Sequence, residues 1–90
     1  MNINELAKKY EDFKSGMIKH SEMQLTDNNE LIVYGCKSIA KYDENYIKLG
    51  LASFGVSIDG LELKMSNFSD GGVIIRGKIH SITFLDTEEL

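Results

Sequence analysis

The chain of 90 residues has no proline, a single cysteine, and no apolar run long enough to cross a bilayer. Without proline, every strand keeps its backbone donors and can occupy the middle of a sheet. Cys36 cannot form an internal disulfide, which favours a cytoplasmic protein. A spanning helix needs about 20 apolar residues, so the sequence predicts no direct membrane span. The first ten residues, MNINELAKKY, also lack the pattern of a signal peptide.

Concentrated positive charge is missing as well. The net charge is −4, and residues 21–90 carry six basic against eleven acidic side chains, a net −5. Proteins that bind nucleic acid need a basic surface to neutralise phosphates. We therefore expect no nucleic-acid partner.

The residue types that build metal and catalytic sites are sparse. His20 and His80 are the only histidines, and no CxxC or HxxxH spacing exists. A structural zinc site needs four closely spaced N or S ligands, so we expect no metal and no cofactor. A nucleophilic Cys36 would need a nearby histidine, and His80 could supply one because both residues follow glycines that end similar segments. We expect His80 to be a surface residue instead, and keep a small enzyme or ligand-binding fold that uses Cys36 and His80 as an alternative.

Neighbouring carboxylates are interpreted as solvated charge. Acid–base catalysis requires two carboxyl groups in one cleft with different pKa values. The pairs in this chain fall at expected turns, strand edges and the tail: Asp43 with Glu44, Asp59 with Glu62, and Glu88 with Glu89. We therefore name no catalytic residue and expect a protein that is not an enzyme.

Residues 1–20 have a helical period. Ile3, Leu6, Tyr10, Phe13 and Met17 recur every three or four residues and would share one face of a short amphipathic helix. This face could pack on the protein's own sheet, or it could bind a partner or membrane surface. We take Leu6, Tyr10, Phe13 and Met17 as the candidate interaction face.

Residues 21–90 have a period of two and are expected to form a single β domain. Segments rich in β-branched and aromatic residues alternate with turn signals at TDNN (26–29), DEN (43–45) and SDGG (69–72). Their close spacing leaves no room for crossover helices. The expected fold is mainly β: the N-terminal helix, then about seven or eight short, mostly antiparallel strands in a small sandwich or partial barrel. The eight segments are 23–25, 30–35, 38–42, 46–51, 54–59, 61–66, 73–77 and 78–85.

Three segments share one pattern that ends in glycine. LIVYG (31–35), VSIDG (56–60) and VIIRG (73–77) each alternate apolar and other residues before Gly35, Gly60 and Gly77. A glycine in a strand permits a bulge or a close approach by another strand. Phosphate-binding loops instead need several glycines before a helix. We therefore interpret the three glycines as structural.

The stretch from Glu30 to Leu85, about two-thirds of the chain, resembles the YabP/YqfC family of sporulation proteins. The resemblance is carried by VYGCKSIAKYDENYIKL (33–49), VSIDGLELKMS (56–66) and GVIIRGKIHSITFL (72–85), and it is closer to the YqfC branch. It implies a small cytoplasmic protein of the mother cell that takes part in forming the spore envelope, which means the cortex or the coat. Family members are typically encoded beside an integral membrane protein, which implies such a partner and a peripheral position at the forespore membrane. The resemblance supplies no catalytic residues.

Two functional hypotheses follow. The first is a non-enzymatic interaction and assembly module with a membrane-protein partner. The second is a β scaffold that self-assembles into oligomers or polymers through strand edges. A thin core is often stabilised by a second copy, whereas Lys37, Lys41, Lys48, Lys64 and Lys78 are charges of the kind that limit edge-to-edge association.

Overall fold

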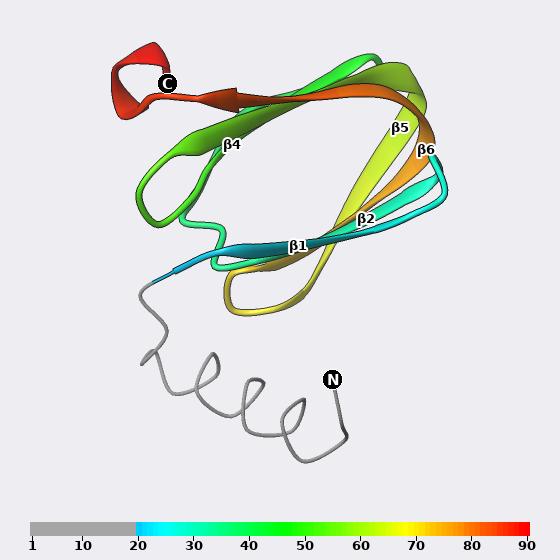
Figure 1. Cartoon of the computed structure of the whole chain (residues 1–90). Helices are drawn as coiled ribbons and strands as arrows, with labels where there is room; N and C mark the ends of the chain where they lie inside the picture. Colours follow the sequence, from blue (N-terminus) through cyan, green and yellow to red (C-terminus); the bar gives the residue numbers. More distant parts are fainter. Residues whose placement is uncertain (1–19) are drawn as a thin grey trace.

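The computed structural model describes residues 20–90, which form six β-strands and one short 3₁₀ helix (Figure 1). The strands are β1 (Glu22–Thr26), β2 (Glu30–Tyr34), β3 (Ser38–Tyr42), β4 (Tyr46–Gly50), β5 (Gly55–Ser69) and β6 (Gly72–Leu85). The 3₁₀ helix η1 (Thr87–Glu89) follows β6. The mainly β prediction is confirmed for this part of the chain. The predicted helix over residues 1–20, with Leu6, Tyr10, Phe13 and Met17, falls almost wholly outside it.

The predicted turns lie where the sequence places them. Residues 27–29 connect β1 to β2, and Asp27 has a φ of 46°, which Asp tolerates better than most residues. Asp43 closes the β3–β4 turn, because its Oδ1 accepts a hydrogen bond from the Asn45 amide at 2.8 Å. Asp70 and Gly71 connect β5 to β6, and Gly71 has a φ of 75°. Short polar side chains and glycine therefore set the hairpins.

All six strands belong to one antiparallel sheet in the order β1-β2-β6-β5-β4-β3. The two longest strands, β5 and β6, lie at the centre and pair with each other along most of their length. β2 pairs with the first part of β6, from Val73 to Arg76, whereas β4 pairs with the first part of β5, from Gly55 to Asp59. Each outer hairpin therefore covers only one end of the central pair.

The prediction of seven or eight strands is wrong, because two pairs of predicted segments are continuous. Apart from Phe54, which precedes the strand, the predicted segments 54–59 and 61–66 both belong to β5, and the predicted segments 73–77 and 78–85 both belong to β6. The register of β5 against β6 shifts between Asp59 and Gly60 and again between Leu61 and Lys64. Glycine bends these strands without ending them.

Gly60 and Gly77 face the opposing strand at that bend. A Cβ on Gly60 would collide with the carbonyl oxygen of Lys78, and one on Gly77 would lie 2.6 Å from the carbonyl oxygen of Glu62. Gly77 also has a φ of 139°, which residues with side chains rarely adopt. The structural interpretation of both glycines agrees with these close approaches.

Gly35 has a different role. It follows β2 with a φ of 79°, and a Cβ there would lie 2.8 Å from the His20 carbonyl oxygen. The chain then crosses to β3, while the Cys36 amide donates to the Gly71 carbonyl and the Lys37 amide donates to the Gly50 carbonyl. Ser21 supports this crossing, since its hydroxyl donates to the Gly35 carbonyl and accepts from the Ala52 amide, both at 2.9 Å. Gly35 thus ends a strand, whereas Gly60 and Gly77 lie within strands.

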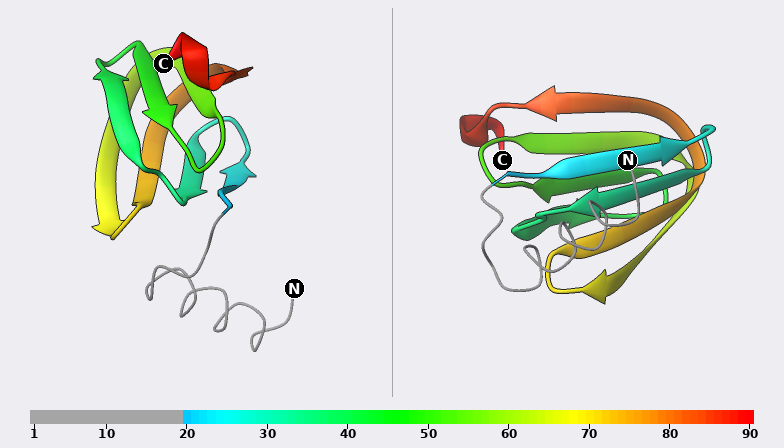
Figure 2. Two further views of the ribbon diagram at one scale, coloured as in Figure 1. Left: turned by 90° about the vertical axis from the view of Figure 1, so that its left-hand side faces the viewer. Right: turned by 60° about the horizontal axis from the view of Figure 1, so that its bottom comes forward.

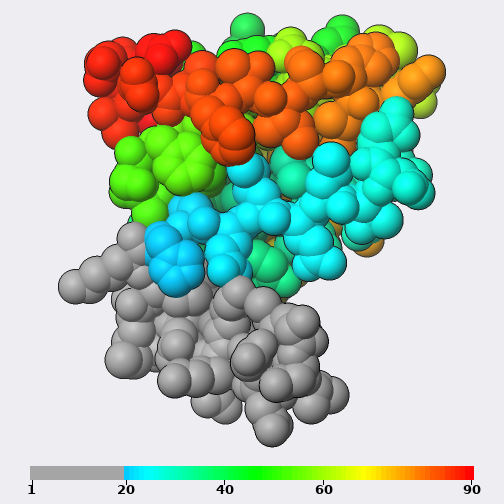
Figure 3. Space-filling view, in the orientation of Figure 1, coloured from blue at the N-terminus to red at the C-terminus, as the bar shows by residue number. Residues whose placement is uncertain are grey.

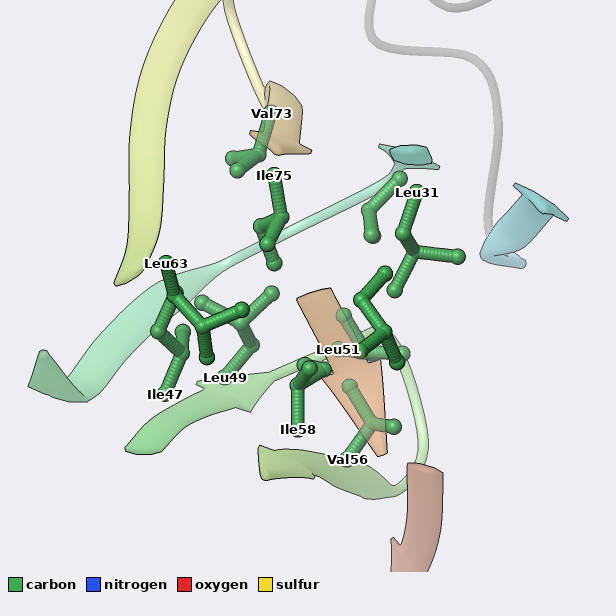
Figure 4. Packing of buried hydrophobic residues seen from close by; sticks show 11 residues of the cluster. Leu31, Ile47, Leu49, Leu51, Val56, Ile58, Leu63, Val73 and Ile75 are labelled. Carbon is green, nitrogen blue, oxygen red and sulfur yellow. The ribbon is translucent and has the colours of Figure 1, made fainter. Parts of the chain in front are cut away.

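The bend folds the single sheet over itself, so that its two halves face each other (Figure 2). Side chains from both halves meet in one cluster of eleven buried apolar residues (Figure 4). They are Leu31, Val33, Ile47, Leu49, Leu51, Val56, Ile58, Leu63, Val73, Ile75 and Ile79. These residues are mostly the apolar members of the alternating pattern, which places them on the inner face. The fold leaves two strands, β1 and β3, at the edges of the sheet.

Candidate interaction surface

The edge strand β3 is exposed along its whole length. All five of its residues are exposed, and among the described strands it is hydrogen-bonded to β4 alone. Ile39 lies opposite Leu49 and Tyr42 opposite Ile47, so both apolar side chains belong to the inner face of the sheet. Ile39 nevertheless remains 45% exposed and Tyr42 48% exposed. The register shifts between Ile39 and Lys41, which leaves Ala40 in a bulge.

The side of β3 away from β4 faces the second half of β5. There the Met65 amide donates to the Tyr42 hydroxyl at 3.2 Å, in place of a backbone carbonyl. A shallow pocket lies farther along, between Ser38 and Ile39 on one side and Asn67 on the other. β5 pairs with β6 on its other side, so this part of β5 and β3 form two neighbouring edges that no ladder joins.

The opposite edge strand, β1, is also exposed. Figure 3 shows it at the surface in blue to cyan. Leu25 is 52% exposed although it lies opposite the buried Leu31 on the inner face. Glu22 at the start of β1 lies 3.7 Å from the His20 imidazole. Both edges of the sheet thus present apolar inner-face side chains to solvent.

Cys36 lies at the end of the pocket beside β3. Its thiol is half-buried and donates to the Ser38 carbonyl at 3.4 Å. Burial raises the pKa of the Cys36 thiol. A raised pKa lowers the thiolate fraction at neutral pH, and the thiolate is the nucleophile.

His80 lies away from Cys36. It is exposed on β6, and the amide of its neighbour Ile79 donates to the Asn28 carbonyl, in the turn before β2. Cys36 follows the other end of β2, and a five-residue strand spans roughly 17 Å. The inference that the two lie close is therefore wrong, because Gly35 and Gly77 are not equivalent. The expectation that His80 is a surface residue is confirmed.

Two of the paired carboxylates accept hydrogen bonds from other residues of the fold. Asp59 accepts a hydrogen bond from the Ser81 hydroxyl at 3.3 Å, and Glu89 accepts one from the Asp86 amide at 3.0 Å. Within residues 20–90, no group of three or more His, Cys, Asp or Glu side chains could hold a metal ion. The same part of the chain contains no helix long and apolar enough to cross a membrane.

The exposure of Ile39, Tyr42 and Leu25 was not predicted from the sequence. Their alternation is the same as that of buried residues, and only the strand order distinguishes an edge from the centre. Lys37 and Lys41 were the available signal, because lysines are typical of edge strands.

Comparison with known proteins gives a family and no closer relative. No curated protein and no solved structure matches the chain. The model of the YabP family matches residues 17–90, which includes every strand of the sheet. The chain therefore belongs to the YabP family.

Proposed function

We propose that this chain is a non-enzymatic sporulation protein of the YqfC branch, which acts in the mother cell as a small interaction and assembly module. In this proposal an integral membrane protein holds it at the forespore membrane during formation of the spore envelope. Membership of the YabP family is consistent with a role in sporulation. The branch is proposed from the sequence GCK at residues 35–37 and the closing GKIHSITF at residues 77–84.

The observation that carries the interaction role is the exposed edge formed by β3. The backbone edge of β3 faces the second half of β5, so a partner would bind chiefly through the exposed side chains of this strand. Ile39 and Tyr42 add exposed apolar area beside this backbone. Aromatic side chains such as tyrosine are common among residues that dominate binding energy.

The amphipathic segment of residues 1–20 is a second candidate contact. The stripe of Leu6, Tyr10, Phe13 and Met17 would place apolar side chains on one face of a helix. It could serve the same partner. The two contacts can be separated by substitution, because one lies on β3 and the other precedes the sheet.

Fractionation of sporulating cells tests the proposal. The tagged full-length chain should float with forespore membranes. The double variant Ile39→Asp, Tyr42→Ala should lower the membrane-bound fraction by about tenfold or more, which is the loss expected for a central contact. Phe13→Asp tests the N-terminal stripe in the same assay. Leu61→Asp is the matched control, because Leu61 is equally exposed, at 48%, but lies on β5.

Circular dichroism should show the same β content in all four proteins. The proposed recruitment is wrong if the wild-type chain stays in the soluble fraction throughout sporulation. Recruitment by another surface is indicated if the wild type floats and neither the β3 nor the Phe13 variant changes this.

A further inference from the structure

The outer face of the sheet differs between its two halves. In the half that contains β4 and the first part of β5, the outer-face rows are mostly polar: Lys48, Ser57 and Thr83 in one row, and Tyr46, Asp59 and Ser81 in the next. In the half that contains β2 and the first part of β6, Ile32 lies directly opposite Ile74 on the outer face. An antiparallel sheet usually has one apolar face on the core and one polar face in water. An apolar row on the outer face therefore indicates that this half is covered.

Two aromatic rings extend this apolar row. Tyr34 follows the buried Val33 and so belongs to the outer face, where its ring meets the Phe68 ring edge-on with 5.6 Å between the centroids. Phe68 lies over Gly72, because a Cβ on that glycine would come within 2.6 Å of the Phe68 ring. Phe68 is 41% exposed, and the other three side chains of the surface are partly buried. We call this surface the outer patch, and it consists of Ile32, Tyr34, Phe68 and Ile74.

Residues 1–19 join the described region at one end of the outer patch. The Ser21 hydroxyl donates to the Gly35 carbonyl at 2.9 Å, and a Cβ on Gly35 would lie 2.8 Å from the His20 carbonyl oxygen. Gly35 directly follows Tyr34 in the chain. The segment that precedes His20 therefore starts beside the outer patch, and it needs no long connection to reach it.

We propose that the amphipathic segment of residues 3–17 covers the outer patch as a helix, with its apolar stripe against the sheet. The sequence leaves two alternatives for this stripe, the protein's own sheet or a partner, and the proposal assigns it to the first. This contact goes beyond the proposed membrane recruitment and does not depend on it. While the stripe covers the outer patch, its side chains are not available to the membrane partner, which leaves β3 as the surface for that partner.

The dimensions of the segment and the sheet agree. A helix over residues 3–15 is about 20 Å long. The strand β2, from Glu30 to Tyr34, runs for about 14 Å. A helix that returns along β2 from His20 therefore spans the whole outer patch. Gly16 lies between this helix and His20, where a glycine permits the chain to change direction.

The stripe also supplies side chains that suit the outer patch. Tyr10 and Phe13 would add two rings to the pair formed by Tyr34 and Phe68, and edge-to-face contacts between aromatic rings are favourable. The polar side chains of the segment fall between the stripe residues and would remain in water. They are Lys8, Lys9, Glu11, Asp12 and Lys14.

A helix of this length is not stable by itself. Isolated helices shorter than about 12–15 residues are marginal in water, and Gly16 weakens this one further. Without a surface to pack on, the backbone amides of residues 4–15 would exchange with solvent almost as fast as those of an unfolded chain. Protection of these amides from exchange therefore reports packing of the helix.

Hydrogen exchange of the full-length chain, followed by mass spectrometry, tests the proposal. In the wild type the amides of residues 4–15 should exchange at least about tenfold more slowly than in an unstructured chain of the same sequence. Phe68→Asp places a charge in the outer patch and Phe13→Asp places one in the stripe, so each should abolish this protection. The amides of β5 and β6 show in the same experiment whether the sheet remains folded. If Phe68→Asp unfolds the sheet, the milder Phe68→Ala takes its place, with loss of protection expected again.

Two control variants match these changes. Phe84→Asp alters a phenylalanine that is more exposed, at 66%, but lies opposite the buried Val56 on the inner face. Lys8→Asp introduces the same side chain as Phe13→Asp on the opposite side of the predicted helix. Both variants should keep the protection of the wild type.

The proposal is overturned if residues 4–15 of the wild type exchange as fast as an unstructured chain. It is also overturned if a folded Phe68 variant keeps the protection, and loss of protection in Phe84→Asp alone would place the stripe at the edge of β6 instead. Protection that falls on dilution from about 100 µM to 1 µM would contradict it as well, because the stripe then covers a second copy of the chain.

Discussion

At the scale of single residues, the question about Cys36 is whether its thiol is reactive or has a structural role. Cys36 belongs to the sequence GCK, and the surroundings of its side chain explain why a cysteine fits at this position. The side chain is half-buried beside the start of β3, and its backbone amide donates to Gly71 at the β5–β6 hairpin. A small, weakly polar side chain fits this crossing point. His80 lies near the other end of β2, where it cannot accept the thiol proton.

Alkylation of Cys36 tests this interpretation. Burial raises the pKa of the thiol, so the thiolate fraction at pH 7–8 is below that of free cysteine. We expect iodoacetamide to react several times more slowly with the folded chain than with free cysteine. Unfolding in urea should bring the two rates together, and His80→Ala should leave the folded rate unchanged. Faster reaction in the folded state, lost in His80→Ala, would restore the Cys36–His80 site as a candidate.

At the scale of elements, the continuous strands β5 and β6 determine the fold. Both cross from one half of the sheet to the other at the bend that contains Gly60 and Gly77. The bend also leaves the second half of β5 without β4 as a neighbour. The free edges therefore follow from the same glycines that close the core.

Substitution of Gly77 tests how tightly the bend is packed. Gly77→Ala should lower the free energy of unfolding by about 2–4 kcal/mol, because it combines an unfavourable φ with a contact to the Glu62 carbonyl. Urea unfolding followed by circular dichroism gives this value. Gly55→Ala is the control, since the atoms nearest to its Cβ would belong to the side chain of Leu90, which can move aside. Equal losses in the two variants would show that the bend tolerates a side chain.

The elements also show how far sequence patterns predict this fold. Alternation placed every strand, and the residues of TDNN, DEN and SDGG placed three turns, because both signals are local. The pairing of β2 with β6 joins residues 40 or more positions apart, and no local pattern specifies it. Ile39 alternates like Ile47, yet one is exposed and the other buried, since edge position depends on the order of the whole sheet.

At the scale of the whole molecule, the described region has one thin core and much exposed apolar surface. Eleven buried apolar side chains stabilise it, while Leu25, Ile39, Tyr42, Leu61, Phe68, Phe84 and Leu90 are all more than 40% exposed. Small domains have free energies of unfolding near the lower end of about 5–15 kcal/mol. A single core side chain is therefore a large share of the total.

Substitutions at a buried and at an exposed position measure how much one side chain contributes to the free energy of unfolding. They also show whether the exposed position is covered in solution. Ile75 is fully buried between Leu31 and Met65, so Ile75→Val should cost about 0.5–1.5 kcal/mol and Ile75→Ala about 2–5 kcal/mol in urea unfolding. Leu61→Ala should cost less than about 0.5 kcal/mol, because that side chain is half exposed. If Leu61→Ala instead costs as much as Ile75→Ala, this part of β5 is covered in solution and cannot serve as a neutral control for binding at β3.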